Sequence, residues 1–147
     1  MKVWPEFNDC GDLPEGIHVA SLEEVVHRFA TTPRRTVIAR RLERIFQLAC
    51  STGHLSRTVV FGSYITAKSE PNDVDIFMMM DDSFDVRQVS PEASLVFDHA
   101  AAQNLFGASV FWLRRAAALG GEEATIAYWQ MKRDGGRRGI VEVVSHD

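Results

Sequence analysis

A seven-residue run at 74–80 constrains the fold more than any other part of the sequence. It contains one charge, Asp75, and otherwise only valine, isoleucine, phenylalanine and methionine. Pro71-Asn72 precedes it and Asp81-Asp82 follows it, so turn-forming residues bound it on both sides. A short apolar run with such borders predicts a strand. The apolar residues after Asp75 should anchor this strand in the core.

Helical patterns and further strands alternate along the rest of the chain. Ser21 followed by Glu24 is a capping box, and Thr32-Pro33 is a typical helix start. The sequence predicts helices at about 21–29, 32–49, 98–106 and 122–133 and strands at 58–61, 108–113 and 139–144, whereas 94–97 is ambiguous. This alternation indicates an α+β (α/β-like) fold, in which helices flank a mixed central β-sheet.

The length of the chain suits one domain over residues 1–147, because 147 residues leave little room for a second core. Residues 1–20 are rich in proline, glycine and aspartate and show no hydrophobic period. We expect them to form an irregular N-terminal arm that its few apolar side chains attach to the body.

Composition excludes several classes of protein. The formal net charge of -4 argues against a protein that binds nucleic acid through overall basicity. Cys10 and Cys50 are the only cysteines, and their spacing fits neither a disulfide framework nor a zinc site. No stretch approaches the roughly 18 apolar residues of a membrane helix, and the apolar start is interrupted by Pro5 and Glu6. We expect a cytoplasmic protein with two free thiols and no membrane partner.

Two acids stand where the apolar run begins. Asp73 and Asp75 are separated by one residue, and side chains in a strand repeat every second residue, so both should project to the same face. Two adjacent carboxylates repel each other unless a cation lies between them. Mg²⁺ is such a cation, because it binds carboxylate and phosphate oxygens together. The pair therefore predicts a metal site for Mg²⁺ or Mn²⁺.

A glycine-serine turn precedes the acids. Gly62-Ser63 ends the predicted strand 58–61, and nine residues separate it from Asp73. Glycine lets the backbone approach a ligand closely, and a helix starting at Tyr64 would aim free N–H groups at phosphate. Ser63 adds a hydroxyl, and Lys68 adds a counter-charge in the loop. An anion-binding turn beside a metal pair is what phosphoryl or nucleotidyl transfer requires.

This arrangement resembles the signature of the DNA polymerase β-like nucleotidyltransferase superfamily, including the minimal nucleotidyltransferases of bacteria and archaea. The motif covers roughly residues 58–80. The runs Phe7-Asn8-Asp9, Gly11-Asp12-Leu13-Pro14 and Arg133-Asp134-Gly135 extend a looser similarity, to small bacterial proteins assigned to that superfamily, over most of the chain. The resemblance implies the nucleotidyltransferase fold.

The resemblance also implies roles for individual residues. Asp73 and Asp75 would be the catalytic, metal-binding acids, and Gly62, Ser63 and Lys68 would bind the phosphates of a nucleoside triphosphate. A third carboxylate on a neighbouring strand completes the site in this superfamily. The matching strand is residues 107–111, where the expected position holds Ser109. A serine does not replace a carboxylate as a base or as a strong metal ligand.

Each candidate residue also has a purely structural interpretation. Asp73 and Asp75 are then solvated turn residues, Ser63 an ordinary turn residue and Lys68 a solvated loop lysine. Asp98 and Glu142, the other candidates for the third acid, are better explained as a helix cap and an exposed edge residue. The arginines of the predicted helix 32–49 form either a solvated face or a surface for RNA or an acidic partner (Arg34, Arg35, Arg40, Arg41 and Arg44).

Two hypotheses on function follow. The first is an enzyme that transfers a nucleoside monophosphate from a nucleoside triphosphate to a hydroxyl of a protein or RNA acceptor such as tRNA. Small members of this superfamily often occur in toxin–antitoxin or phage-defence pairs, and the resemblance implies such a setting for this chain. The second is a catalytically degenerate binding module that acts through a protein or RNA partner, and Ser109 is its main support.

Overall fold

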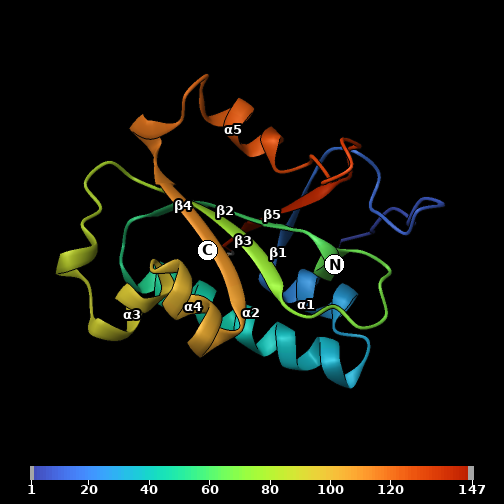
Figure 1. Cartoon of the computed structure of the whole chain (residues 1–147), viewed down its shortest axis with the longest axis horizontal. Coiled ribbons are helices and arrows are strands. Elements are labelled where there is room, and N and C mark those ends of the chain that lie inside the picture. Colours follow the sequence, from blue (N-terminus) through green and yellow to red (C-terminus); the bar gives the residue numbers. More distant parts are fainter. Residues whose placement is uncertain (1, 146–147) are drawn as a thin grey trace.

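The computed structural model describes residues 2–145, whose five strands form a single mixed sheet (Figure 1). The order across the sheet is β1-β5-β2-β3-β4. β1 and β5 are parallel, as are β3 and β4, while β2 is antiparallel to both of its neighbours. The strands are β1 (Ile17–Ser21), β2 (Leu55–Phe61), β3 (Val74–Met80), β4 (Ala108–Arg114) and β5 (Ile140–Val144). The predicted α+β architecture is confirmed.

The helices are divided unequally between the two faces of this sheet. In Figure 1 α1 to α4 cover one face and α5 lies over the other. The helices are α1 (Leu22–Phe29), α2 (Pro33–Ser51), α3 (Pro91–Val96), α4 (His99–Phe106) and α5 (Glu122–Tyr128). None of the helices in the described part of the chain is both long and apolar enough to cross a membrane.

Two apolar cores result, one on each face, and β3 contributes to both. Ile76, Met78 and Met80 face the large core under α1 to α4, whereas Phe77 and Met79 face a smaller core beneath α5. All five side chains are at most 1% exposed. Burial on both faces explains why the run at 74–80 is almost continuously apolar rather than alternating.

Local signals fixed several element boundaries correctly. Ser21 and Glu24 form the predicted capping box, and Thr32 caps α2 directly before Pro33. Asp98 accepts a hydrogen bond from the Ala101 N–H at the start of α4, so its prediction as a helix cap is confirmed. Each cap satisfies backbone N–H groups that a helix start leaves unpaired.

Two expectations about secondary structure were wrong in part, and the structure assigns one segment that was ambiguous. The arm predicted at 1–20 is irregular only to Gly16, because Ile17–Ser21 forms β1 by pairing with β5. The ambiguous segment 94–97 belongs largely to α3. The helix predicted to reach Arg133 ends at Tyr128 and gives way to turns. Non-local pairing explains the first error, since the partner strand lies more than a hundred residues away.

Arg35, near the start of α2, does not belong to the solvated face that was one interpretation of the sequence, whereas Arg34, Arg40 and Arg44 are exposed as that interpretation expects. Arg35 is 4% exposed and donates hydrogen bonds to the backbone carbonyls of Tyr64, Thr66 and Lys68. Arg34 donates to the carbonyls of Pro71 and Asn72. These two side chains brace the loop that joins Gly62-Ser63 to Asp73, so they serve the architecture of the candidate site.

Candidate functional site

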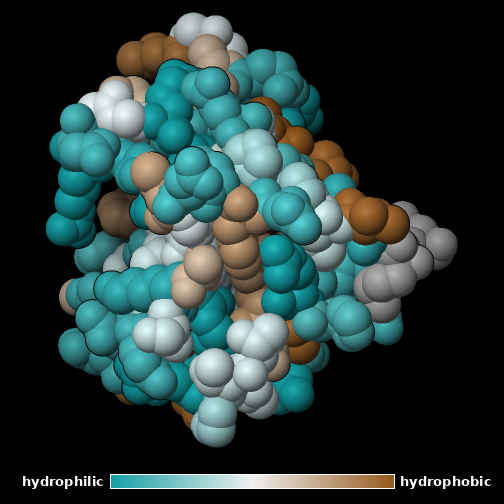
Figure 2. Space-filling view, turned by 90° about the vertical axis from the view of Figure 1, so that its right-hand side faces the viewer, coloured by the Kyte–Doolittle hydropathy of each residue, from teal (hydrophilic) through white to brown (hydrophobic). Residues whose placement is uncertain are grey.

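The predicted acids and the predicted turn meet in one polar cleft. It has a volume of about 590 Å³ and is lined by Ser63, Lys68, Asp73 and Asp75 together with residues from more distant segments. The loop 62–73 and the segment after α5 lie on the right-hand side of Figure 1, and Figure 2 looks onto that side, where hydrophilic residues prevail. Four of the five predicted site residues therefore line the same cleft, and Gly62 lies directly behind Asp75.

The contact between Gly62 and Asp75 defines the floor of the cleft. Phe61, the last residue of β2, is the register partner of Asp75 in β3. A β-carbon built at Gly62 would lie 2.0 Å from Asp75 Oδ2, and the φ of Gly62 is +80°. No other residue type fits this position without displacing the carboxylate. The glycine is therefore required by packing against the acid as well as by its backbone conformation.

The helix expected after Ser63 is much shorter than predicted. Ser63–Ile65 forms a single 3₁₀ turn, after which Thr66 is extended. Such a turn has no helix dipole of useful size, so the anion-binding capacity of the cleft depends on side chains instead. Lys68, exposed at the rim, is one of them.

Asp75 is the acid whose ionisation the cleft changes most clearly. Burial, followed by the charge of Asp73, raises the pKa of Asp75 from 3.8 to about 6. The Ser109 hydroxyl lies 3.4 Å from Asp73 Oδ2, to which it donates a long hydrogen bond, and it accepts one from Gln103 Nε2 at 3.2 Å. Ser109 is also the register partner of Asp75 on β4. The serine thus occupies the place on the neighbouring strand where the resemblance leads one to expect a third acid.

Neither alternative third acid reaches the cleft. Asp98 caps α4. Glu142 lies on β5, between β1 and β2, and accepts two hydrogen bonds at 2.8 Å from Arg57. Its expected position on an exposed edge was therefore wrong. Arg57 and Glu142 line a separate cavity, not the cleft that Asp73 and Asp75 line.

A cationic wall that the sequence analysis missed faces the acids. Lys132, Arg133 and Arg138 line the cleft, as does Asp134. Lys132 and Arg133 were predicted to lie in a helix ending at Arg133, but α5 ends earlier and the chain turns back, with Met131 bridging to Arg137. The available signal was the run of basic residues around Asp134-Gly135-Gly136.

Asp12 holds this wall in place. Its side chain, 5% exposed, accepts from Lys132 Nζ at 3.0 Å and from Arg138 at 3.3 Å. Hydrogen bonds between Asn8 and Asp12 close the surrounding loop. The carbonyl of Gly11 in this loop also accepts a hydrogen bond from the Ala67 N–H. The run around Arg133 therefore forms the opposite wall of the cleft, and the runs around Asn8 and Asp12, which lie far from it in sequence, support that wall from behind.

The donor set fits one magnesium ion that shares its ligands with a phosphate. Mg²⁺ in nucleotide-binding sites is held by one or two carboxylates, with phosphates and waters completing the octahedron. Asp73 and Asp75 would provide these carboxylates, and a cation would relieve their mutual repulsion. Within residues 2–145 no group of three or more histidine, cysteine, aspartate or glutamate side chains is placed to hold a metal ion.

Comparison with known proteins gives one match. The model of a family of unknown function, DUF6932, matches residues 5–144, which include every residue of the cleft. No curated protein and no solved structure matches the chain. Because the match spans nearly the whole sequence, the chain belongs to the DUF6932 family.

Proposed function

We propose that this protein is a nucleotidyltransferase of the DNA polymerase β-like superfamily. It transfers a nucleoside monophosphate from a nucleoside triphosphate to a hydroxyl of a protein or RNA acceptor, such as tRNA. One observation carries the proposal: Asp75 packs on Gly62, and both acids line a cleft with Ser63 whose other wall is cationic. Binding a triphosphate together with Mg²⁺ requires both the acids, which hold the metal ion, and the cationic wall, which faces the phosphates.

The charges of the cleft suit a triphosphate. Four cationic side chains line it, and they outnumber the three carboxylates of Asp73, Asp75 and Asp134. Lys68 and Ser63 would contact the phosphates from one side, and Lys132, Arg133 and Arg138 from the other. Mg²⁺ held by Asp73 and Asp75 would neutralise charge on the reacting phosphate. The cationic wall would stabilise the departing pyrophosphate as its charge develops.

Calorimetric titration of the purified protein with each nucleoside triphosphate, in Mg²⁺ and in Mn²⁺, tests binding. We expect binding by the wild type and loss of it in Asp75→Ala. Asp9→Ala is the matched control, because Asp9 is an exposed carboxylate that does not line the cleft. Absence of binding by the wild type with either metal ion contradicts the proposal.

Ser109 favours a second candidate function. Without a third acid, the same cleft would bind a nucleotide or another polyanion and act through a partner without transferring anything. Incubation with labelled triphosphates and candidate acceptors separates the two functions, with Asp75→Ala as the inactive reference. Label transfer by the wild type alone excludes the binding module, whereas binding without transfer to any acceptor favours it.

The biological setting follows from the resemblance alone. We propose a cytoplasmic role, in a toxin–antitoxin or defence pair. RNA binding through the arginines of α2 is not carried forward, because Arg34 and Arg35 brace the loop of the cleft while Arg40 and Arg44 pair with Glu43 and Glu92.

A further inference from the structure

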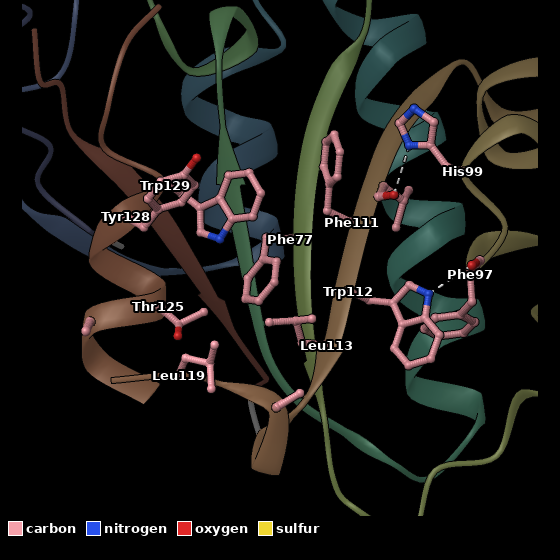
Figure 3. A pocket seen from close by; sticks show the side chains of 13 residues that line it. Phe77, Phe97, His99, Phe111, Trp112, Leu113, Leu119, Thr125, Tyr128 and Trp129 are labelled. Carbon is pink, nitrogen blue, oxygen red and sulfur yellow. Dashed lines mark hydrogen bonds between the residues drawn. The ribbon is translucent and has the colours of Figure 1, made fainter. Parts of the chain in front are cut away.

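The sheet face beneath α5 carries a large apolar cavity. α5 is only seven residues long and leaves much of this face uncovered (Figure 1). A cavity of about 860 Å³ lies between α5 and β4. In Figure 3 Tyr128, the last residue of α5, and Trp129 directly after it border the cavity on one side, and Phe111 and Leu113 of β4 border it on the other. Phe77 lies between them. The volume is within the range of about 300–1,000 Å³ that is typical of small-molecule sites.

This aromatic cavity lies next to the acid pair on the same face of the sheet. Asp75 and Phe77 are two residues apart on β3, and Ser109 and Phe111 are two residues apart on β4. The register pairs Asp75 with Ser109 and Phe77 with Phe111. Side chains two positions apart on a strand share a face at a spacing of about 6.6 Å. The aromatic cavity therefore starts one step along the sheet from the acids.

The acids thus lie between two different environments. Ser63, Lys68 and the cationic wall belong to loops beyond the ends of β2 and β3, whereas the aromatic cavity extends along the strands in the other direction. In phosphoryl and nucleotidyl transfer the attacking and leaving oxygens are roughly in line on opposite sides of phosphorus. If pyrophosphate leaves toward the cations, the acceptor hydroxyl approaches from the side of the aromatic cavity.

The lining of the aromatic cavity restricts the acceptor. No lysine, arginine, aspartate or glutamate lines it, so it offers no counter-charge for an RNA backbone. Aromatic side chains dominate, and Trp129 stacks against Phe77 at 5.0 Å and lies 5.4 Å from Phe111. The indole Nε1 of Trp129 is buried and has no hydrogen-bond partner among the described residues. His99, whose ring lies 5.0 Å from Phe111, adds a polar edge.

We infer that the aromatic cavity binds the acceptor, and that the acceptor is an uncharged aromatic ring carrying the hydroxyl, that is, a phenol. The inference rests on the proposed function. The acceptor oxygen forms a bond to the α-phosphorus, the bond from that phosphorus to the bridging oxygen breaks, pyrophosphate leaves and the hydroxyl proton is released to solvent. A free phenol and a tyrosyl side chain share this chemistry.

Phenol binding is tested first without nucleotide, by saturation-transfer NMR with p-cresol and with a tyrosine-containing peptide. An oligoribonucleotide serves as the competing class of acceptor. Phe111→Ala should weaken phenol binding about tenfold, the loss expected for one stacking partner. Leu113→Glu, at a half-exposed position, should do the same by adding a charge. Leu105→Ala is the matched control, being exposed on α4 and outside the cavity.

Nucleotide binding and transfer are then measured on the same variants. Phe111→Ala and Leu113→Glu should keep the triphosphate affinity of the wild type and lose transfer, while Asp75→Ala should keep phenol binding. Transfer to the peptide but not to p-cresol identifies a protein acceptor, and the reverse identifies a small molecule. Unchanged phenol binding in both cavity variants, transfer to the oligoribonucleotide alone, or a dimer that buries Leu113 overturns the inference. Absence of triphosphate binding in the wild type overturns the proposed function instead.

Discussion

The side chain of Asp75 occupies the space that a β-carbon at Gly62 would need, because that carbon would lie 2.0 Å from Asp75 Oδ2. Gly62, directly after β2, and Asp75, near the start of β3, are therefore held against each other. This contact places the carboxylate beside Ser63, and it makes the glycine-serine turn and the acid pair one structural unit.

Substitution of Gly62 by alanine should displace Asp75. Gly53 provides a matched control, because its φ of +76° is nearly the same and nothing lies within 4 Å of a β-carbon there. Gly53→Ala should cost about 1 kcal/mol, the usual penalty for a β-carbon at positive φ. Gly62→Ala should lose about 3 kcal/mol more, because its φ of +80° and ψ of −163° lie in a region essentially restricted to glycine and because the new β-carbon overpacks against Asp75. Urea denaturation measures the difference, and equal losses in the two variants would contradict the packing argument.

The stability of the metal-free protein should depend on the ionisation of Asp75. Burial and the charge of Asp73 raise its pKa from 3.8 to about 6. An acid with a raised pKa in the folded state contributes its stabilisation fully below pH 3.8, and this contribution is lost as the pH rises through 6. Asp75→Asn should therefore gain stability relative to the wild type between pH 4 and pH 7.

Denaturation of the two proteins across this pH range, without divalent ions, measures the effect. A difference in the free energy of unfolding that does not change with pH would contradict it. Asp81→Asn is a useful comparison, because hydrogen bonds from Ser83 and His54 lower the pKa of Asp81 and give the opposite sign. The contribution of Asp81 is present above about pH 3.8 and is lost as the pH falls below it, so the stability difference for Asp81→Asn should change little between pH 4 and pH 7 and shrink only at lower pH.

Removal of the Asp12 charge should weaken the cationic wall. Asp12→Asn leaves Lys132 and Arg138, both about three-quarters buried, without their anionic partner, and should cost about 2 kcal/mol. Glu15→Gln is the control, since Glu15 and Arg137 form an ion pair in which both side chains are about half exposed. Pairs of that kind contribute at most about 1 kcal/mol. Chemical denaturation compares the two, and similar losses would show that burial of Asp12 is unimportant.

The buried Arg35 should contribute more to folding stability than Arg40, an exposed arginine on the same helix. Arg35→Met leaves the carbonyls of Tyr64, Thr66 and Lys68 without their donor, and should cost about 3 kcal/mol. Arg40→Met, on the same helix, removes a side chain that is 63% exposed and should cost less than about 0.5 kcal/mol.

Thermal and urea unfolding measure both variants. Proteolysis should also detect faster cleavage within residues 64–72 in Arg35→Met, because the loop loses its brace. If Arg35→Met were as stable as Arg40→Met, the loop would have to be held by contacts other than these hydrogen bonds.

The sequence alone determined the features that depend on neighbouring residues. Ser21, Thr32 and Asp98 cap their helices because capping involves residues three positions apart. The central strand was predicted with its correct bounds, since turn residues border an apolar run. The sequence also predicted that the acid pair, Ser63 and Lys68 lie near one another, and all four line the same cleft, because a strand fixes the direction of alternate side chains and the loop between them is short.

Only the tertiary structure decided the features that depend on distant pairing. The burial of Arg35, the pairing of β1 with β5, and the meeting of Asp12 with Lys132 join segments separated by roughly thirty to more than a hundred residues. No local period records such contacts, because their free energy comes from surfaces that exist only after the chain has folded. The cationic wall and the aromatic cavity were invisible for this reason, although the acids between them were not.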